Sequence, residues 1–298
     1  MIVADSTNFV RFVRGYWKYL VAVVVVLIAV EIANDYVNFD RRALSPTSIG
    51  LVVTALSIFL VFRVGEAYSR WWEARGHWGY IVNDSRSFAR QITNLVSDES
   101  AHARLVYRQL AWINGLRHAL RGEDDRESIA PFLANDERTK IEGAKNHATQ
   151  LMQLQGRDLA ELQAAGAIDP IGRWVLEETM SRLTNHQGGC EKIKATAFPD
   201  RISYFSRITA WGLAAAIPAV VLESGNEIDL IDMFVTPFMM LAFLLTERLG
   251  ADLKKPFENR ANDTPMTSLC RTIEIDLRQQ LGETDLLEPL EPVDGVLM

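Results

Sequence analysis

The sequence lacks most of the features that mark a soluble enzyme, a secreted protein or a nucleic-acid-binding protein. Its 298 residues include only two cysteines, Cys190 and Cys270, which are too few and too far apart for a disulfide framework. The formal net charge is −7 and no basic stripe occurs, so we expect no nucleic-acid partner. No phosphate-binding glycine loop, nucleophile elbow or zincin motif is present, so we expect no enzyme activity and no cofactor.

Metal-ligand patterns are also scarce. The five histidines are scattered between His77 and His186, and only His186 and Cys190 are spaced to share one helix face. The Gly188–Gly189 pair between them is predicted to break that helix, and no third ligand is nearby. We therefore interpret His186 as an ordinary surface histidine and expect no metal site.

Strand-like alternation is absent as well, whereas long apolar runs are present. Four stretches are strongly apolar, namely 20–33, 49–62, 208–222 and 230–246, but residues 76–200 have the composition of a soluble helical protein. The pattern predicts an all-α integral membrane protein with four transmembrane helices and a large aqueous helical bundle.

The first two runs allow alternatives. Residues 17–33 are long enough for about one bilayer crossing at roughly 1.5 Å per residue. The alternative is a signal peptide, which Glu31 at the position of a cleavage site opposes. The second run, 49–62, is short and contains Thr54 and Ser57, so it suits a position shielded by protein around a pore. Any single run also fits a buried helix of a soluble protein.

Charge placement predicts the orientation of these spans. The loop between the third and fourth runs has no Lys or Arg, whereas basic residues flank the other ends of the runs. We therefore expect two hairpins in the cytoplasmic (inner) membrane, with both termini cytoplasmic. The flanking basic residues are Arg11, Arg14, Lys18, Arg63, Arg70, Arg75, Arg201, Arg207, Arg248, Lys254 and Lys255.

The chain divides into four predicted parts: an N-terminal segment with the first hairpin (1–75), a cytosolic helical domain (76–200), the second hairpin (201–250) and a C-terminal segment (251–298). Within the cytosolic parts we expect helices at about 137–165, 171–187 and 267–281. Apolar stripes at helical spacing support this division. Their members are Trp78, Ile81, Val82, Ser85, Phe88, Ile92, Leu95 and Val96, then Leu105, Val106, Leu110, Ile113, Leu116 and Leu120.

One stripe in the second run has a functional interpretation. Thr54, Ile58, Phe62 and Glu66 are four residues apart and share one side of a helix. In a lone helix they would be a core-packing stripe, but around a symmetry axis each position becomes a ring. Rings of Ile58 and Phe62 form an apolar constriction, and a Glu66 ring attracts cations. The alternative for Glu66 is an ion pair with Arg70 in the same helix.

Several segments resemble the bestrophin family. LSPTSIGLVVTALSIFLVFR (44–63) and RWWEAR (70–75) resemble the second span of bestrophins and the segment after it. DPI (169–171), KPFENRANDTP (255–265) and CRTIEIDLRQ (270–279) follow in the expected order, so the resemblance covers nearly the whole chain. The bacterial branch is most similar because the C-terminal tail is short.

The resemblance implies a homopentamer around one central pore. It places the membrane neck at Thr54, Ile58 and Phe62 and a cytosolic aperture at Ile171, which is otherwise an apolar residue packed at a helix start. Animal members carry a proline where this chain has Ala55, which argues against an anion site built from exposed helix ends. They also carry an acidic calcium-binding run after the PF motif, whereas Arg260 interrupts it here, so we expect no calcium activation and no metal.

We therefore predict a passive channel for small monovalent ions, with the lipid bilayer and further copies of the chain as its partners. Glu66 and the acidic loop between the last two spans favour sodium-like cation selectivity. The alternatives are an anion channel of the same architecture, a transporter, or a membrane-anchored scaffold without conductance. A transporter usually has inverted repeats, which this sequence does not show.

Overall fold

The computed structural model describes residues 9–37, 46–197, 200–221 and 230–298, and within them the regular structure is helical, with no strand. The all-α prediction is therefore confirmed. The chain forms two compact units. The apolar unit comprises the described parts of Ala4–Arg70 and Ala197–Lys254, and the bundle unit comprises Trp71–Thr196 with Lys255–Met298.

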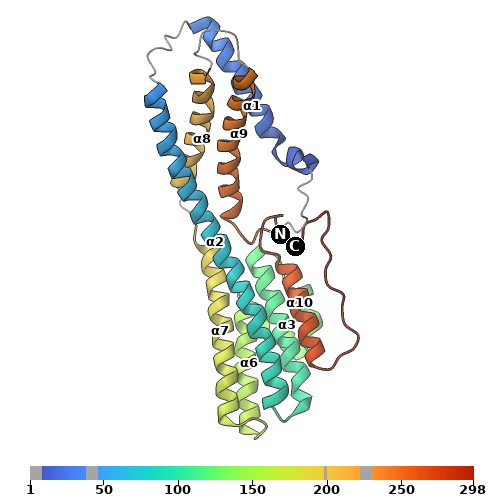
Figure 1. Cartoon of the computed structure of the whole chain (residues 1–298). Helices are drawn as coiled ribbons and strands as arrows, with labels where there is room; N and C mark the ends of the chain where they lie inside the picture. The colour runs from blue at the N-terminus through green and yellow to red at the C-terminus, as the bar shows by residue number, and fades with distance from the viewer. Residues whose placement is uncertain (1–8, 38–45, 198–199, 222–229) are drawn as a thin grey trace. The chain divides into compact units, whose positions relative to one another are not determined.

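The apolar unit contains α1 (Phe9–Val37), the first half of α2 (Pro46–Leu95), α8 (Asp200–Val221) and α9 (Leu230–Leu253). Helices α8 and α9 lie side by side, and α1 contacts both (Figure 1). Their small shared core includes Val23, Ala214, Met240 and Leu244. Two helices in the described residues, Gly50–Leu95 and Phe234–Leu253, are long and apolar enough to cross a membrane. The expected number of four spans stays a prediction.

Helix α2 is much longer than the second apolar run. It continues without interruption for 50 residues, which corresponds to about 75 Å at the rise of an α-helix. The residues after Phe62 have good helix formers and no proline, so nothing in the sequence ends the helix there. The helix passes through residue 75, where the first predicted part of the chain ends.

The bundle unit combines the second half of α2 with α3 (Glu99–Arg121), α6 (His147–Ala164), α7 (Pro170–Ala195) and α10 (Met266–Gln280). Figure 1 shows these helices running alongside one another, with α10 beside α3. The short helices α4 (Arg126–Ile129), η2 (Ala130–Phe132) and α5 (Asn135–Ile141) connect α3 to α6.

The predicted apolar stripes form the core of this unit. Trp78, Phe88 and Trp112 are fully buried, and every member of the two stripes is buried except Leu95. Helix ends follow local rules. The Asp98 side chain caps α3, and Gly122, with a φ of 73°, ends that helix in the left-handed conformation that glycine tolerates.

Two predictions about these helices were wrong. The helix expected over 137–165 is two helices, α5 and α6, because the Asn146 side chain accepts a hydrogen bond from the Thr149 N–H and begins a new helix. The helix expected to end at 187 continues to Ala195, through the Gly188–Gly189 pair. Glycine weakens a helix by only about 1 kcal/mol, which tertiary packing compensates.

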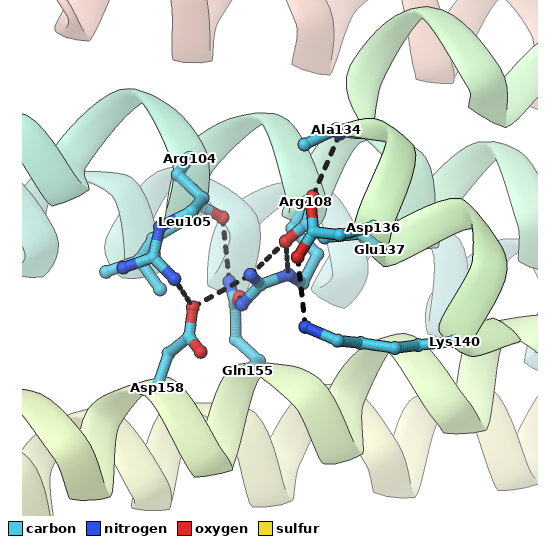
Figure 2. A network of polar contacts seen from close by, with 9 residues as sticks. All are labelled: Arg104, Leu105, Arg108, Ala134, Asp136, Glu137, Lys140, Gln155 and Asp158. Atoms are coloured by element: carbon cyan, nitrogen blue, oxygen red, sulfur yellow. Dashed lines mark hydrogen bonds and ion pairs between the residues drawn. The ribbon is translucent and has the colours of Figure 1, made fainter.

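A buried polar network joins α3, α5 and α6 (Figure 2). The Arg108 guanidinium donates to Glu137, to Gln155 Oε1 at 2.8 Å and to Asp158 Oδ2 at 2.8 Å. The Gln155 amide in turn donates to the Leu105 carbonyl at 2.7 Å. A buried charge is stable only when it is paired and hydrogen-bonded, so this network fixes how the three helices pack.

Replacing Glu137 by glutamine is expected to lower the free energy of unfolding by about 2 kcal/mol, because Arg108 loses the more deeply buried of its two carboxylate partners, Glu137 and Asp158. The neighbouring Asp136 offers a matched control, since its side chain is 67% exposed against 6% for Glu137. Asp136→Asn should leave stability unchanged. Chemical unfolding of both purified variants measures this, and equal losses would contradict the role of the network.

Candidate functional site

The candidate pore stripe, defined as Thr54, Ile58, Phe62 and Glu66, lies on an exposed side of α2. All four residues are exposed in the single chain, and Phe62 is exposed to 72% of its full surface. The opposite side of the helix, including Leu60 and Ala67, is buried. A large apolar side chain left uncovered on a helix of this composition needs lipid or another protein surface to cover it.

Two hydroxyl groups in this stretch are satisfied within the helix. Thr54 Oγ1 donates to the Gly50 carbonyl at 2.8 Å, and Ser57 Oγ donates to the Val53 carbonyl at 2.6 Å. Both residues therefore need no water or side-chain partner, which suits an apolar surrounding. The stripe is polar at Thr54, apolar at Ile58 and Phe62, and acidic at Glu66.

A buried ion pair lies on the inner side of the same helix. Arg63 on α2 donates to Glu247 on α9 at 3.1 Å and also to the Ser206 hydroxyl on α8. The two charged side chains are only 2% and 7% exposed. Beside them Gly250 allows close packing, because a Cβ there would lie 3.2 Å from a Val64 methyl group.

This ion pair was not predicted from the sequence, in which Arg63 was interpreted only as a basic residue flanking the second span and Glu247 was given no role. The available signal was Glu247 itself, an acidic residue near the end of a long apolar run, because ionisable residues in such segments almost always have a partner inside the protein.

Ile171, the predicted aperture residue, lies at the first turn of α7 in the bundle unit. The Asp169 side chain accepts a hydrogen bond from the Gly172 N–H at 2.5 Å and caps the helix, and Pro170 occupies the first turn. Ile171 is 71% exposed, and Trp174, one turn later, is 65% exposed. Ile171 therefore does not pack in a core of the single chain, as the alternative interpretation required.

The segment 255–265 is a compact turn held by its own side chains. The Asp263 carboxylate accepts hydrogen bonds from the backbone N–H groups of Glu258 and Arg260, at 2.7 and 3.1 Å. Glu258 pairs with Lys194, and this hydrogen bond lowers the pKa of its carboxyl. These acidic groups already have protein partners. Among the described residues no group of three or more His, Cys, Asp or Glu has the geometry of a metal site.

The chemistry of His186 and Cys190 is also unsuited to metal binding. His186 contacts His77, with the two Nδ1 atoms 3.2 Å apart, instead of facing Cys190. Cys190 is fully buried, and this burial raises the pKa of its thiol to about 12. The thiol is therefore protonated at neutral pH, whereas metal binding and reaction with electrophiles require the thiolate.

Comparisons with known proteins identify relatives over nearly the whole chain. The family model described as Bacterial/Fungal Bestrophin protein matches residues 12–279. A protein of Mesorhizobium japonicum named a voltage-dependent anion channel-forming protein is 33% identical over 83% of this chain and 78% of its own length. One of the same name from Ralstonia nicotianae is 30% identical over 82% of this chain and 79% of its own.

Solved structures agree with these matches. The crystal structure of a bacterial bestrophin homologue from Klebsiella pneumoniae has a TM-score of 0.82 and is 26% identical, and the match covers 90% of this chain and 98% of the other. The resemblance predicted from the sequence is thereby confirmed. These matches also confirm that the chain is not an enzyme, because the relatives are named channel-forming proteins. The chain belongs to the bestrophin family, in its bacterial and fungal branch.

Proposed function

We propose that this chain is the subunit of a homopentameric channel through which small monovalent ions pass passively across the bacterial inner membrane. The observation that carries the proposal is the exposed candidate pore stripe on α2. Its middle residues, Ile58 and Phe62, are apolar and could face lipid or protein. The stripe ends in Glu66, however, and a charged carboxylate is costly to place in lipid. A stripe of this mixed kind is better suited to line an ion path.

Symmetry converts the stripe into a series of rings. Copies of α2 around one axis would present Thr54 first, then a narrow apolar neck of Ile58 and Phe62, then a ring of Glu66 carboxylates. A neck of large apolar side chains gates ion flow because water leaves it readily. Ile171, exposed at the start of α7, would form a second ring in the cytosolic part of the path.

We further propose that the permeant ions are anions such as chloride. Support comes from the relatives, whose names describe voltage-dependent anion channel-forming proteins. The cation preference expected from the sequence has no comparable support. In this proposal the Glu66 ring lies at a wide part of the path, where an anion can pass farther from each carboxylate than the Debye length of about 8 Å and is screened from its charge.

Cation conduction is the second candidate, and one specific observation favours it. Glu66 is exposed on the same helix as the proposed neck, one turn after Phe62. Several carboxylates around one axis would concentrate cations and repel anions if the path is narrow there.

A reversal-potential measurement on the purified protein in planar bilayers separates the two. With a NaCl gradient, the anion proposal predicts a reversal potential close to the chloride equilibrium potential, and Glu66→Gln should move it closer still. A value close to the sodium equilibrium potential that Glu66→Gln shifts toward zero would establish the second candidate. Absence of unitary current steps under all conditions would overturn the channel proposal and leave a scaffold.

Topology is part of the proposal. The hairpins formed by α1 with α2 and by α8 with α9 would cross the membrane, and both termini would be cytoplasmic. The bundle unit, whose exposed surface carries many ion pairs, would then lie in the cytosol. Single introduced cysteines, one near the N-terminus before the first span and one at 298, test the orientation. Both should react with a membrane-impermeant thiol reagent only after the membrane is permeabilised.

A further inference from the structure

Two histidines from different helices of the bundle unit form a direct pair. His77 on α2 and His186 on α7 have their Nδ1 atoms 3.2 Å apart, and their ring centroids are separated by 5.5 Å. Tyr80 stacks on the His186 ring at 4.9 Å. Both histidine side chains are only about one-fifth exposed. An N–H of one imidazole therefore points at the lone pair of the other, and the pair shares a single proton in this contact.

An acidic group lies near the outer nitrogen of each ring. His77 Nε2 is 3.8 Å from Glu73, which pairs with Lys192, and His186 Nε2 is 3.6 Å from Asp84, which pairs with Arg182. Six groups thus form one continuous chain between α2 and α7. Its ends are electrically balanced, because each carboxylate has its own cation.

The geometry distinguishes the first added proton from the second. A neutral pair has one N–H in the contact, and its donor ring presents an unprotonated Nε2 to a carboxylate. The first proton binds there and is stabilised by that carboxylate. A second proton must bind at the Nδ1 that accepts the hydrogen bond, which would place two N–H groups and two positive charges face to face. The contact between α2 and α7 has to open for this to happen.

The pair is tightly enclosed at one point. A Cβ at Gly189 would lie 2.3 Å from His77 Cε1 and Nε2, so only glycine leaves room for the ring against α7. A Cβ at the neighbouring Gly188 would have no other atom within 4 Å. Gly189 therefore has a specific role in admitting the His77 side chain, whereas Gly188 has none.

The charged surroundings come from both helices. On α2 the groups close to the pair are Glu73, Tyr80 and Asp84. On α7 they are Arg182 and Lys192, with Cys190 and Glu191 about one turn after His186. The pKa of His186 is lowered, first by burial and then by His77 and Arg182, against the opposing effect of Asp84. Protonation of His186 therefore requires a pH below the ordinary histidine pKa of about 6.5.

We propose that the His77–His186 pair is a pH-sensitive switch that opens the contact between α2 and α7 when both imidazoles are protonated in mildly acidic conditions. The inference rests on the proposed channel function for its physiological meaning, because Ile171, the proposed aperture residue, lies in the first turn of α7. Acidification would loosen the helix that carries this residue and change ion flow. An allosteric coupling of this kind typically corresponds to a change of about fivefold or more.

The first test compares currents of the full-length protein in bilayers at pH 7.5 and pH 5.0. The wild type should change its mean current by about fivefold or more, and His77→Gln and His186→Gln should abolish most of that change, since glutamine can hydrogen-bond but does not titrate. His102→Gln removes a histidine of α3 that bonds the Val96 carbonyl and serves as the control for titration elsewhere. An equal pH response in all four proteins would overturn the switch.

A glycine pair supplies a steric control. Gly189→Ala should displace the His77 ring and remove the pH response, whereas Gly188→Ala should keep it. Both substitutions change helix propensity equally, so their difference reports on the ring alone. Identical behaviour of the two variants would contradict the proposed contact.

A third measurement separates failure of the switch from failure of the proposed channel function. The pKa of His186 is lower in the folded chain than in the unfolded chain, so at a pH between these two values the unfolded chain binds more protons. The free energy of unfolding therefore falls as the pH falls through about 6.5. The thermal midpoint of the wild type should therefore drop more between pH 7.5 and 5.0 than that of His186→Gln. If currents are absent but this difference is seen, and Gly189→Ala removes it while Gly188→Ala keeps it, the switch stands without the channel. If the drop is equal, the switch is wrong whatever the currents show.

Discussion

Replacing Ile58 and Phe62 together by alanine is expected to raise the unitary conductance by about tenfold, because the apolar neck is the narrowest and driest part of the proposed path. A tenfold increase in ion flow corresponds to lowering the barrier by roughly 1.4 kcal/mol. Both side chains are more than half exposed in the single chain, so shortening them creates no cavity in its core. The protein should therefore fold and assemble, and the effect should appear in conductance and not in yield.

Phe238 provides the matched control for the neck variants. It is a phenylalanine in a candidate membrane-spanning helix and is 71% exposed, against 72% for Phe62. If the α2 stripe faces the pore and α9 faces lipid, Phe62→Ala alone should change conductance and Phe238→Ala should not. Unaltered currents in the double neck variant, or equal changes in the Phe62 and Phe238 variants, would mean that the stripe does not line the path.

Periodicity made the helical bundle predictable. The residues from Trp78 to Val96 and from Leu105 to Leu120 recur at helical spacing, and nearly all of them are buried. Helix ends were harder to predict because they depend on single residues. Asn146 begins a helix through one side-chain hydrogen bond. The Gly188–Gly189 pair does not end α7, because tertiary packing, including the contact of Gly189 with His77, compensates the low helix propensity of glycine.

The candidate site was predictable only on one side of α2. Spacing by four placed Thr54, Ile58, Phe62 and Glu66 together, and all are exposed in the structure. The partners of Arg63 were not predictable, because Ser206 and Glu247 lie more than 140 residues away and no local pattern connects them. The His77–His186 pair was not predictable for the same reason, because its two residues are 109 positions apart. Long-range polar pairs require the fold before they can be recognised.

The buried pair of Arg63 and Glu247 should have the largest effect on stability. Arg63→Met is expected to lower the free energy of unfolding by about 3–5 kcal/mol, because it leaves the Glu247 charge buried without a partner. The pair connects α2 to α9, and Ser206 adds α8 to the contact, so its loss should also loosen the helix that carries the candidate pore stripe. Thermal unfolding and the yield of intact oligomer on size-exclusion chromatography measure both effects.

Two further variants decide whether charge imbalance is the cause. In Arg63→Met combined with Glu247→Leu no charge is left buried, so the double variant should recover most of the lost stability. Arg248→Met makes the same substitution at an arginine that is 46% exposed and pairs with Asp252 one turn away. A pair of that kind contributes less than about 1 kcal/mol, so little should change. If the double variant is as unstable as Arg63→Met, the loss comes from packing around the arginine side chain, and the two charges do not hold α2 against α9.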